Sequence, residues 1–273
     1  MTFVIDSEEK DMIPKMAKFL LRTRLMKSLM TKLGYGSYLR TLSKNAFSDQ
    51  QMLLSGIKVQ AIFDIGAHVG QTVAKYSTLF PESTIYCFEP FPESFEELRR
   101  RFKGNSLVKP IQFAVSNKVV PTHKFYVNQC SDTNSLLPTV DDVEYWSNIL
   151  NVTTIEVPVT TIDAFCKQES INEIQILKMD IQGGELMALK GATEKLNQEA
   201  ISLIYTEAEF VPLYKDQALF YEICDLLSGY RYTLFDIYDV HYTRNGQLVW
   251  CNAIFLSARM RARMIKKIIN ESQ

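Results

Sequence analysis

Short apolar runs alternate with stretches of helical periodicity along most of the chain after about residue 59. Apolar runs bounded by turn residues predict strands, and apolar positions at three- and four-residue steps predict helices. The predicted strands cover residues 59–66, 83–90, 106–116, 122–129, 174–180, 200–209, 231–239 and 247–257, and the predicted helices 71–80, 92–102, 183–196 and 213–230. An Asn-Gly turn at residues 245–246 makes the last two strands a hairpin. This alternation predicts an α/β fold with a mostly parallel sheet, helices on both faces and antiparallel strands at one edge.

A basic amphipathic helix is predicted before this region. No acidic residue occurs from Met12 to Ser48, while Lys and Arg supply eight positive charges there. Apolar residues in this stretch recur at helical spacing until Gly34 and Gly36. We therefore expect a helical N-terminal extension over residues 1–57 and an α/β domain over residues 58–273. The basic face is either a solvated surface or a contact with an anionic membrane or charged substrate, and the apolar face suits pairing of subunits in a homo-oligomer.

Composition narrows the choice of partners and compartment. The 30 Lys and Arg side chains nearly balance 31 Asp and Glu, so overall charge gives no argument for a nucleic-acid partner. Five scattered cysteines form no C-x-x-C pair or zinc spacing, which predicts free thiols in a reducing compartment. No apolar run approaches the roughly 18 residues of a membrane span, and the first residues lack the order of a secretory signal. We expect a cytoplasmic protein that binds no nucleic acid.

Carboxylates end the first two strands of the predicted domain. Asp64 is followed by Gly66 and Gly70, and Glu89 comes 25 residues after Asp64, near the spacing at which an acidic side chain binds a ribose diol. His68 stands where a dinucleotide site needs a second glycine so that the pyrophosphate can approach. A nucleoside without phosphates has no such need, and the added carboxylate favours a cationic ligand. These features favour S-adenosylmethionine.

Later strands bring further candidates to the same edge of the sheet, because ligands of open α/β sheets bind beyond the carboxyl ends of the strands. Ala114 and Val115 are placed to pack on an adenine face, and Asp180 ends its strand facing the cofactor. Glu185 begins the next helix, where its charge suits the helix dipole, and Glu207 lies near the end of the following strand. In the structural alternative, Ala114 and Val115 are core residues, and Glu185 is only a first-turn helix residue with Lys178 as its salt-bridge partner.

Taken together, these segments resemble the FkbM family of S-adenosylmethionine-dependent methyltransferases. The matching blocks span roughly residues 59 to 210 and read, in order, FDIGAHVGQT, YCFEPFPESFEELRRRF, FAVSN, TNSLLPT, VPVTTIDAF and ILKMDIQGGELMALKGA. The family usually has Asn where His68 stands and commonly an acidic residue where Gln182 stands. The flanks, residues 1 to 55 and about the last sixty, match poorly.

The resemblance implies a class I, Rossmann-like methyltransferase fold with a seven-stranded sheet, and O-methylation of a sugar, glycoside or secondary metabolite. Asp64, Gly66 and Gly70 would then bound the methionine part of the cofactor, Glu89 would hold the ribose, and the TNSLL segment would close over the cofactor. The full set of candidate cofactor-binding residues is Asp64, Gly66, His68, Gly70, Glu89, Ala114, Val115, Asn134, Ser135 and Asp180.

Methyl transfer to a hydroxyl needs a group that takes the proton. Asp180 is the first candidate for this catalytic base and His68 the second, while Glu185, Glu207 and His241 are candidates for contacting the acceptor. The chain lacks a compact acidic cluster of the D-x-x-x-D-D kind, so we expect no metal requirement.

Three alternative functions stay open at this point. A NAD(P)-dependent oxidoreductase would share the fold, although His68 and the lack of a Tyr-x-x-x-Lys pair argue against it. A non-catalytic module would use the basic helix to dock on a membrane or glycan carrier. A methyltransferase acting on a protein is the third.

Overall fold

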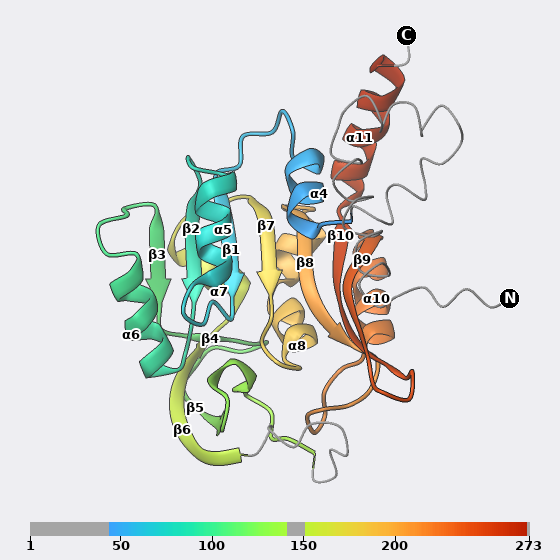
Figure 1. The fold of residues 1–273 in the computed structure, drawn as a ribbon. Coiled ribbons are helices and arrows are strands. Elements are labelled where there is room, and N and C mark those ends of the chain that lie inside the picture. The colour runs from blue at the N-terminus through green and yellow to red at the C-terminus, as the bar shows by residue number, and fades with distance from the viewer. Residues whose placement is uncertain (1–43, 141–150, 272–273) are drawn as a thin grey trace, which may run out of the picture. The chain divides into compact units, whose positions relative to one another are not determined.

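The computed structural model describes residues 44–140 and 151–271, and those from Gln50 onward belong to one compact unit (Figure 1). The described part begins with helix α4 (Ala46–Leu53). The predicted basic helix, which ends at Gly34 and Gly36, lies outside the described residues. That helix and the boundary predicted at residue 57 therefore stay predictions.

A seven-stranded sheet is the centre of this unit. Its strands are β1 (Ala61–Ile65), β2 (Thr84–Phe88), β3 (Val108–Ile111), β7 (Ile174–Met179), β8 (Ile201–Glu209), β9 (Thr233–Tyr242) and β10 (Leu248–Leu256). They lie in the order β3-β2-β1-β7-β8-β10-β9, and only β10 pairs antiparallel with its neighbours. The predicted mostly parallel sheet with an antiparallel hairpin at one edge is confirmed.

Helices cover both faces of this sheet, as predicted. Helices α5 (Gln71–Leu79) and α6 (Pro92–Arg101) lie on the face turned to the viewer in Figure 1. The other face packs against α7 (Ile162–Gln168), α8 (Glu185–Lys190), α9 (Thr193–Asn197) and α10 (Phe220–Gly229). All five residues of β1 are buried, because a central parallel strand is covered from both sides. Phe63 and Leu177 belong to the core on the α7–α10 side.

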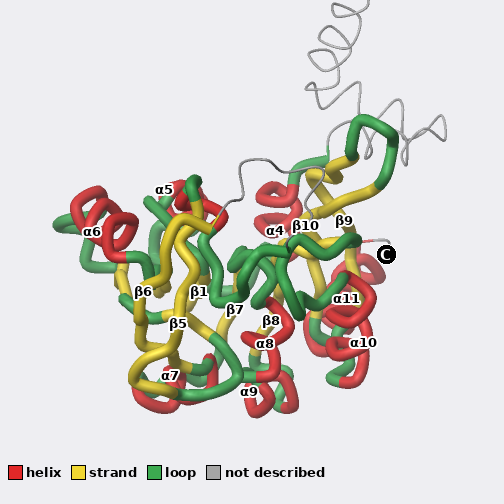
Figure 2. The backbone as a smooth tube through the Cα atoms, turned by 90° about the horizontal axis from the view of Figure 1, so that it is seen from below, coloured by secondary structure: helices red, strands yellow, loops and turns green. Residues whose placement is uncertain are grey.

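A second sheet of three strands lies beyond the carboxyl ends of β1 and β2, as Figures 1 and 2 show from two directions. Its order is β4-β6-β5, with β4 (Ala114–Val115), β5 (Val120–Asn128) and β6 (Asn151–Thr160). Ala114, Phe125, Val157 and Val159 form a small core of their own. After β5 and before β6, the chain passes through a 3₁₀ turn, η1 (Ser131–Thr133). This sheet places β4 and η1 near the strand ends.

Several element predictions were wrong in detail. The single strand predicted over residues 106–116 is two strands in different sheets, because the Phe113 amide bonds back to the Ile111 carbonyl and turns the chain. Strand β6, helix α7 and the C-terminal helix α11 (Ala258–Glu271) were not predicted. Thr161, whose side chain accepts from the Ala164 amide, was an available helix-start signal for α7.

Two predicted helices are shorter than expected. The helix over residues 183–196 is interrupted between α8 and α9, and the helix over residues 213–230 begins only at Phe220. Before Phe220 the chain turns at Asp216, with φ at 60°, while the amides of Leu213 and Tyr214 donate to the side chain of Gln217. These side-chain bonds satisfy backbone donors without a helix.

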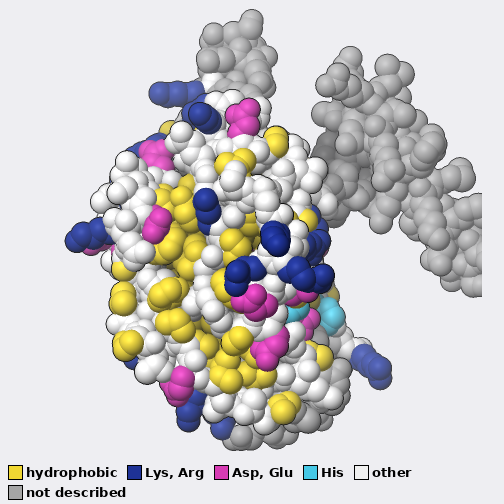
Figure 3. Space-filling model, turned by 90° about the vertical axis from the view of Figure 1, so that its left-hand side faces the viewer, with side chains coloured by type: hydrophobic (Ala, Val, Ile, Leu, Met, Phe, Trp, Pro, Cys, Tyr) yellow, Lys and Arg dark blue, Asp and Glu magenta, His cyan; other side chains and the backbone are white. Residues whose placement is uncertain are grey.

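Strand β3 is the edge strand of the main sheet opposite β9. Figure 3 shows hydrophobic side chains gathered on this side of the molecule. A groove beside it is lined by Tyr86, Pro110, Phe113 and Phe165, among others. Lys109 is exposed on the same strand. A lysine and a proline on an edge strand oppose its pairing with a further strand.

Replacing Gly191 with Ala is expected to lower stability by about 2 kcal/mol or more, because overpacking displaces well-packed neighbours. A Cβ at this position would lie 2.1 Å from the backbone oxygen of Ser116. Gly229→Ala is the matched control, since a Cβ there meets nothing within 4 Å. Chemical denaturation of both variants checks this, and equal stabilities would contradict it.

Candidate functional site

The loops after β1 and β7 touch at Gly66. Its φ of 77° is in the left-handed region, and a Cβ there would lie 1.9 Å from the backbone oxygen of Asp180. Gly70 also has a positive φ, but a Cβ there would lie 2.4 Å from the ring of Phe102, the residue that follows α6. Gly66 therefore allows the approach of two strand ends, whereas Gly70 allows a helix to pack.

His68 connects this turn to two other segments. Its backbone amide donates to Oε2 of Glu89 at 2.8 Å, and its Nε2 lies 2.8 Å from Oγ of Ser131 in η1. Its φ is 48°, a left-handed value that Asn adopts more readily than most residues, which is a physical reason for the family's usual Asn here. Burial lowers the pKa of the imidazole, so the ring is neutral near pH 7.

Glu89, at the end of β2, is 6% exposed. Its Oε2 accepts from His68, and its Oε1 accepts from the Phe91 amide at 2.9 Å. Burial raises the pKa of this carboxyl to about 7, while the two amide donors act in the opposite direction. Each oxygen keeps further lone-pair capacity for a ligand hydroxyl.

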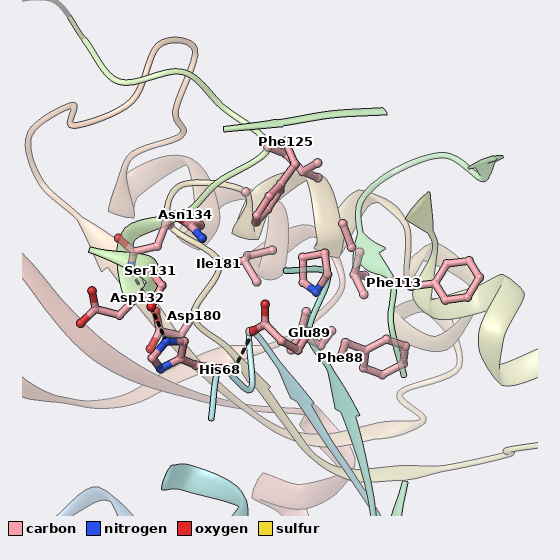
Figure 4. A pocket seen from close by; sticks show the side chains of 18 residues that line it. His68, Phe88, Glu89, Phe113, Phe125, Ser131, Asp132, Asn134, Asp180 and Ile181 are labelled. Carbon is pink, nitrogen blue, oxygen red and sulfur yellow. Dashed lines mark hydrogen bonds between the residues drawn. The ribbon is translucent and has the colours of Figure 1, made fainter. Parts of the chain in front are cut away.

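A cavity opens beside Glu89, here called the β2 pocket (Figure 4). Its walls include the apolar side chains of Ala114, Val115, Phe125 and Ile181, so the predicted positions at β4 do line a cavity. Figure 4 shows Glu89, Asn134 and Phe125 directed into the space between the loops. The cavity volume is about 50 Å³.

Asn134 supplies an unused hydrogen-bond donor to the β2 pocket. It is 8% exposed, and its Oδ1 accepts from the Asn128 amide at 2.8 Å. Its Nδ2 is buried without a hydrogen-bond partner among the described residues. Because a buried donor without a partner is costly, a ligand acceptor here would be stabilising.

A second cavity, here called the β8 pocket, adjoins the first and has a volume of about 340 Å³. Asp180, Gln182, His68 and Asp132 line both pockets. The other polar or acidic lining residues come from three elements: Gln71 and Thr72 from α5, Thr133 from η1, and Glu207 and Glu209 from β8. Three apolar residues complete the lining: Ala67, Leu213 and Trp250. The two catalytic candidates of the sequence thus lie where the pockets meet.

Gln182 holds the carboxylates at this junction. Its Nε2 donates to Oδ1 of Asp180 at 3.0 Å and to Oε2 of Glu207 at 2.8 Å. Its Oε1 lies 2.9 Å from the hydroxyl of Tyr214, which donates to it. The backbone φ of Gln182 is 56°, so the turn that presents this amide is in the left-handed region. One amide therefore fixes the spacing of two acidic groups.

Asp64 lies beneath the pockets and lines neither. Its side chain is fully buried, and its Oδ1 lies 3.0 Å from Nζ of Lys178 on β7. The same ammonium donates to the Gly66 carbonyl at 2.9 Å and lies 3.8 Å from Oδ2 of Asp180. Burial raises the pKa of Asp64 and Lys178 limits that rise, while the surrounding carboxylates keep Lys178 protonated. The ion pair ties the β1 turn to β7.

Three other candidates also lie outside the pocket linings. Ser135 donates its hydroxyl to the Gln182 carbonyl at 2.7 Å, and Glu185 accepts from the Ile181 amide at 2.8 Å with its carboxyl buried. His241 is exposed on β9 and stacks on Trp250, with ring centroids 5.2 Å apart. Ser135 and Glu185 therefore hold the turn after β7, and His241 supports a pocket residue.

Sequence reasoning missed pocket residues that depend on tertiary pairing, such as Phe125 from β5 and Asp132 from η1. Trp250, which lies opposite Glu209 in the β10–β8 register, is one of several aromatic residues that the sequence offers for stacking on a sugar or aromatic ring, and no local signal singles it out. Asp132 directly precedes the TNSLL block and was within reach of sequence analysis.

Other expectations concern metals, thiols and membranes. In the described part of the chain, no three His, Cys, Asp or Glu side chains are grouped so that they could hold a metal ion. All five cysteines are free, as predicted. None of the helices within residues 44–140 and 151–271 has the length and apolar character needed to cross a membrane.

The strand order, with an antiparallel strand inserted before the edge and a glycine turn beside an acidic strand end, defines a class I methyltransferase fold. The chain belongs to the FkbM methyltransferase family, because the model described as "Methyltransferase FkbM domain" matches residues 64–234. The resemblance seen in the sequence is confirmed. S-adenosylmethionine is the methyl donor, and the unpartnered Asn134 donor and the Glu89 carboxylate fit such a ligand.

Individual relatives are distant. A curated relative, the 2-O-methyltransferase NoeI of Sinorhizobium fredii (strain NBRC 101917 / NGR234), is 24% identical over 176 residues, which cover 62% of this chain and 72% of that protein. An rRNA methylase structure from Streptococcus thermophilus has a TM-score of 0.44 at 10% identity and covers 79% of this chain and 98% of its own. Aeropyrum pernix fibrillarin with natively bound S-adenosyl-L-methionine has a TM-score of 0.40 at 11% identity, covering 76% and 73%.

Proposed function

We propose that this protein is an O-methyltransferase that methylates a hydroxyl group of a sugar, glycoside or secondary metabolite. One observation carries the proposal: two pockets of different chemistry meet at Asp180 and His68. The β2 pocket has apolar walls and a ribose-type carboxylate, and the β8 pocket is polar. The relative named a 2-O-methyltransferase supports oxygen as the methylated atom.

The β2 pocket would hold the nucleoside end of the donor. Glu89 accepts hydrogen bonds from the ribose hydroxyls, and Ala114, Val115 and Phe125 form the apolar surface for adenine. Asn134 offers its free amide hydrogens to a ligand acceptor. Asp64, Gly70 and Ser135 act through the loops that they support rather than by contact.

Bound S-adenosylmethionine supplies an electrophilic methyl group, so the protein must orient the acceptor and remove its proton. Asp180, at the junction of the pockets, accepts the hydroxyl proton as the oxygen–carbon bond forms and the carbon–sulfur bond breaks. Gln182 keeps the Asp180 carboxylate at the junction through its 3.0 Å hydrogen bond. Neutral His68 is the second group able to accept a proton there.

The family assignment favours methyl transfer over the nicotinamide-dependent alternative. Membrane contact through the basic extension, a cytoplasmic location and pairing of subunits stay predictions. The same holds for a protein acceptor and for independence of metal ions.

An acceptor screen with radiolabelled S-adenosylmethionine tests the proposal. The panel contains neutral methyl glycosides, phenolic glycosides and an unfolded protein, and mass spectrometry with NMR locates the new methyl group. We expect methylation of hydroxyl oxygen on a small molecule. Transfer to protein side chains or to nitrogen alone would contradict it.

Affinity for S-adenosylhomocysteine is expected to rise with pH through about 7. The carboxyl of free Glu89 has a pKa of about 7, and its ionised form is the better acceptor for ribose hydroxyls. Because a group with that pKa is about one-tenth ionised one unit lower, affinity at about pH 6 should be up to about tenfold below that at about pH 8.

Glu89→Gln is the matched variant for this prediction, because it keeps the shape and removes the titration. Its affinity should be lower at about pH 8 and should vary with pH by less than about threefold. Calorimetry at both pH values gives the comparison. A wild-type affinity that does not change with pH would show that Glu89 does not titrate on binding.

A further inference from the structure

The β8 pocket is strongly acidic. Four carboxylates line it, from Asp132, Asp180, Glu207 and Glu209, and none of its lining residues in the described part of the chain is Lys or Arg. Lys178 is not among the lining residues; its Nζ is engaged by Asp64 at 3.0 Å and lies 3.8 Å from Oδ2 of Asp180. Neutral His68 does not balance these charges. An anionic group on the reacting part of an acceptor would be repelled here.

Glu209 is the deepest of these carboxylates. It is 1% exposed, and its Oε2 has no hydrogen-bond partner among the described residues. Burial raises the pKa of this carboxyl, and the charge of Glu185 raises it further. The side-chain amide of Gln217 also faces this carboxyl and lowers its pKa, and its Nε2 is likewise buried without a hydrogen-bond partner among the described residues. A cationic group at this carboxyl would favour its ionised form.

Glu207 stands beside Glu209 on the same face of β8, because alternate residues of a strand project to the same side. Its Oε2 accepts from Gln182 at 2.8 Å. Burial, and after it repulsion from Asp180 and Glu209, raises the pKa of the Glu207 carboxyl. A cation placed between the two glutamates would relieve this repulsion and favour both ionised forms.

Trp250 completes this end of the pocket. It lies opposite Glu209 in the β10–β8 register, and His241 stacks on it with ring planes 9° apart. An indole ring beside carboxylates is a surface that attracts organic ammonium groups through the π face and through charge. A metal ion is a poorer match, since no three potential ligands are grouped for one within the described residues.

We propose that Glu207, Glu209 and Trp250 form a subsite for an ammonium group, so that the acceptor is a hydroxylated amine such as an amino sugar. The inference rests on the proposed function: the ammonium group anchors the acceptor while one of its hydroxyls faces Asp180. The methyl group still goes to oxygen, because a protonated amine has no lone pair for attack.

Three probes that share one pyranose ring and differ only in the group at C2 test the subsite: methyl glucosaminide, methyl N-acetylglucosaminide and methyl glucoside. With protein saturated by S-adenosylhomocysteine, calorimetry should show the glucosaminide binding at least about tenfold tighter than the other two. Glu209→Gln should reduce that preference by about tenfold and leave S-adenosylhomocysteine affinity within about twofold. Glu82→Gln, an exposed carboxylate in the turn before β2, should change neither.

Equal binding of the three probes, or no binding of the glucosaminide, would overturn the ammonium subsite. A preference that survives Glu209→Gln would also overturn it. If magnesium chloride makes the neutral glucoside bind more tightly and a chelator reverses this, the carboxylates bind a metal ion instead. The proposed function fails separately, if S-adenosylhomocysteine does not bind or if no hydroxyl compound is methylated.

Discussion

Replacing Lys178 with Met is expected to destabilise the protein by about 3–5 kcal/mol, because removing one partner leaves a buried charge uncompensated. Lys178 is the charge partner of fully buried Asp64 at 3.0 Å, and it also binds the Gly66 carbonyl. The variant therefore loosens the turn after β1 as well as the ion pair. Denaturant unfolding measures the loss, with circular dichroism to confirm that the variant still folds.

The pH dependence of this loss identifies its cause. Without Lys178, the folded state holds a proton on Asp64 that the unfolded chain releases above about pH 4, so stability falls as pH rises. The deficit relative to wild type should be larger near about pH 8 than near about pH 5.5.

A double variant, Asp64→Asn with Lys178→Met, is the control. It removes both charges and should recover most of the lost stability, since no buried charge is left unpaired. A double variant as unstable as the single one would show that packing, rather than charge, makes Lys178 necessary.

Replacing Asp180 with Asn is expected to lower kcat by about 10²–10⁴-fold, the usual contribution of a positioned general base. Asn keeps the size of the side chain and an oxygen that can accept from Gln182, but it cannot take the hydroxyl proton. Affinity for S-adenosylhomocysteine should stay within about threefold, because Asn keeps the size of the Asp180 side chain while Glu89 and the apolar walls of the β2 pocket are unchanged. Methyl transfer to the best acceptor of the screen, at saturating donor, provides the rate.

His68→Gln is the comparison for Asp180→Asn. His68 lines both pockets, but its ring is already held by Ser131. A decrease in kcat of less than about tenfold is expected if Asp180 is the base. The opposite order, with the larger loss at His68, would make the imidazole the proton acceptor.

The sequence predicted the part of the fold that depends on local patterns. Strands buried on both faces are continuous apolar runs, and the Asn-Gly turn marks the hairpin, so the seven-stranded sheet could be outlined without coordinates. Asp64 and Glu89 were identified because each follows such a run directly. Their separation in the chain placed them on neighbouring strands.

The three-stranded sheet could not be predicted in the same way. Strand β6 pairs with β4 and β5, and its outer residues such as Val152 are exposed, so its pattern is weak. Helix α7 is only seven residues long and was missed with it. Both elements are stabilised by tertiary contacts rather than by local propensity.

In the candidate site, too, local sequence patterns predicted some features, while others depend on tertiary contacts. Sequence identified the positions of Asp180, Glu207 and Asn134, which line the pockets, but also Asp64, Ser135 and Glu185, which support them from beneath. The end of a predicted strand indicates which residue lies at the edge of the sheet. It does not indicate whether the side chain of that residue points into the cavity or bonds to the neighbouring backbone. The contribution of Trp250 depends on β10 lying beside β8, which no local pattern contains.

The most direct test of the account is calorimetric titration of the protein with S-adenosylhomocysteine and, in parallel, NADH, for wild type and Glu89→Ala. We expect that S-adenosylhomocysteine binds, that NADH does not, and that the substitution weakens S-adenosylhomocysteine binding by about tenfold or more. Binding of NADH, or S-adenosylhomocysteine affinity unchanged by Glu89→Ala, would contradict a methyl-donor site at the end of β2.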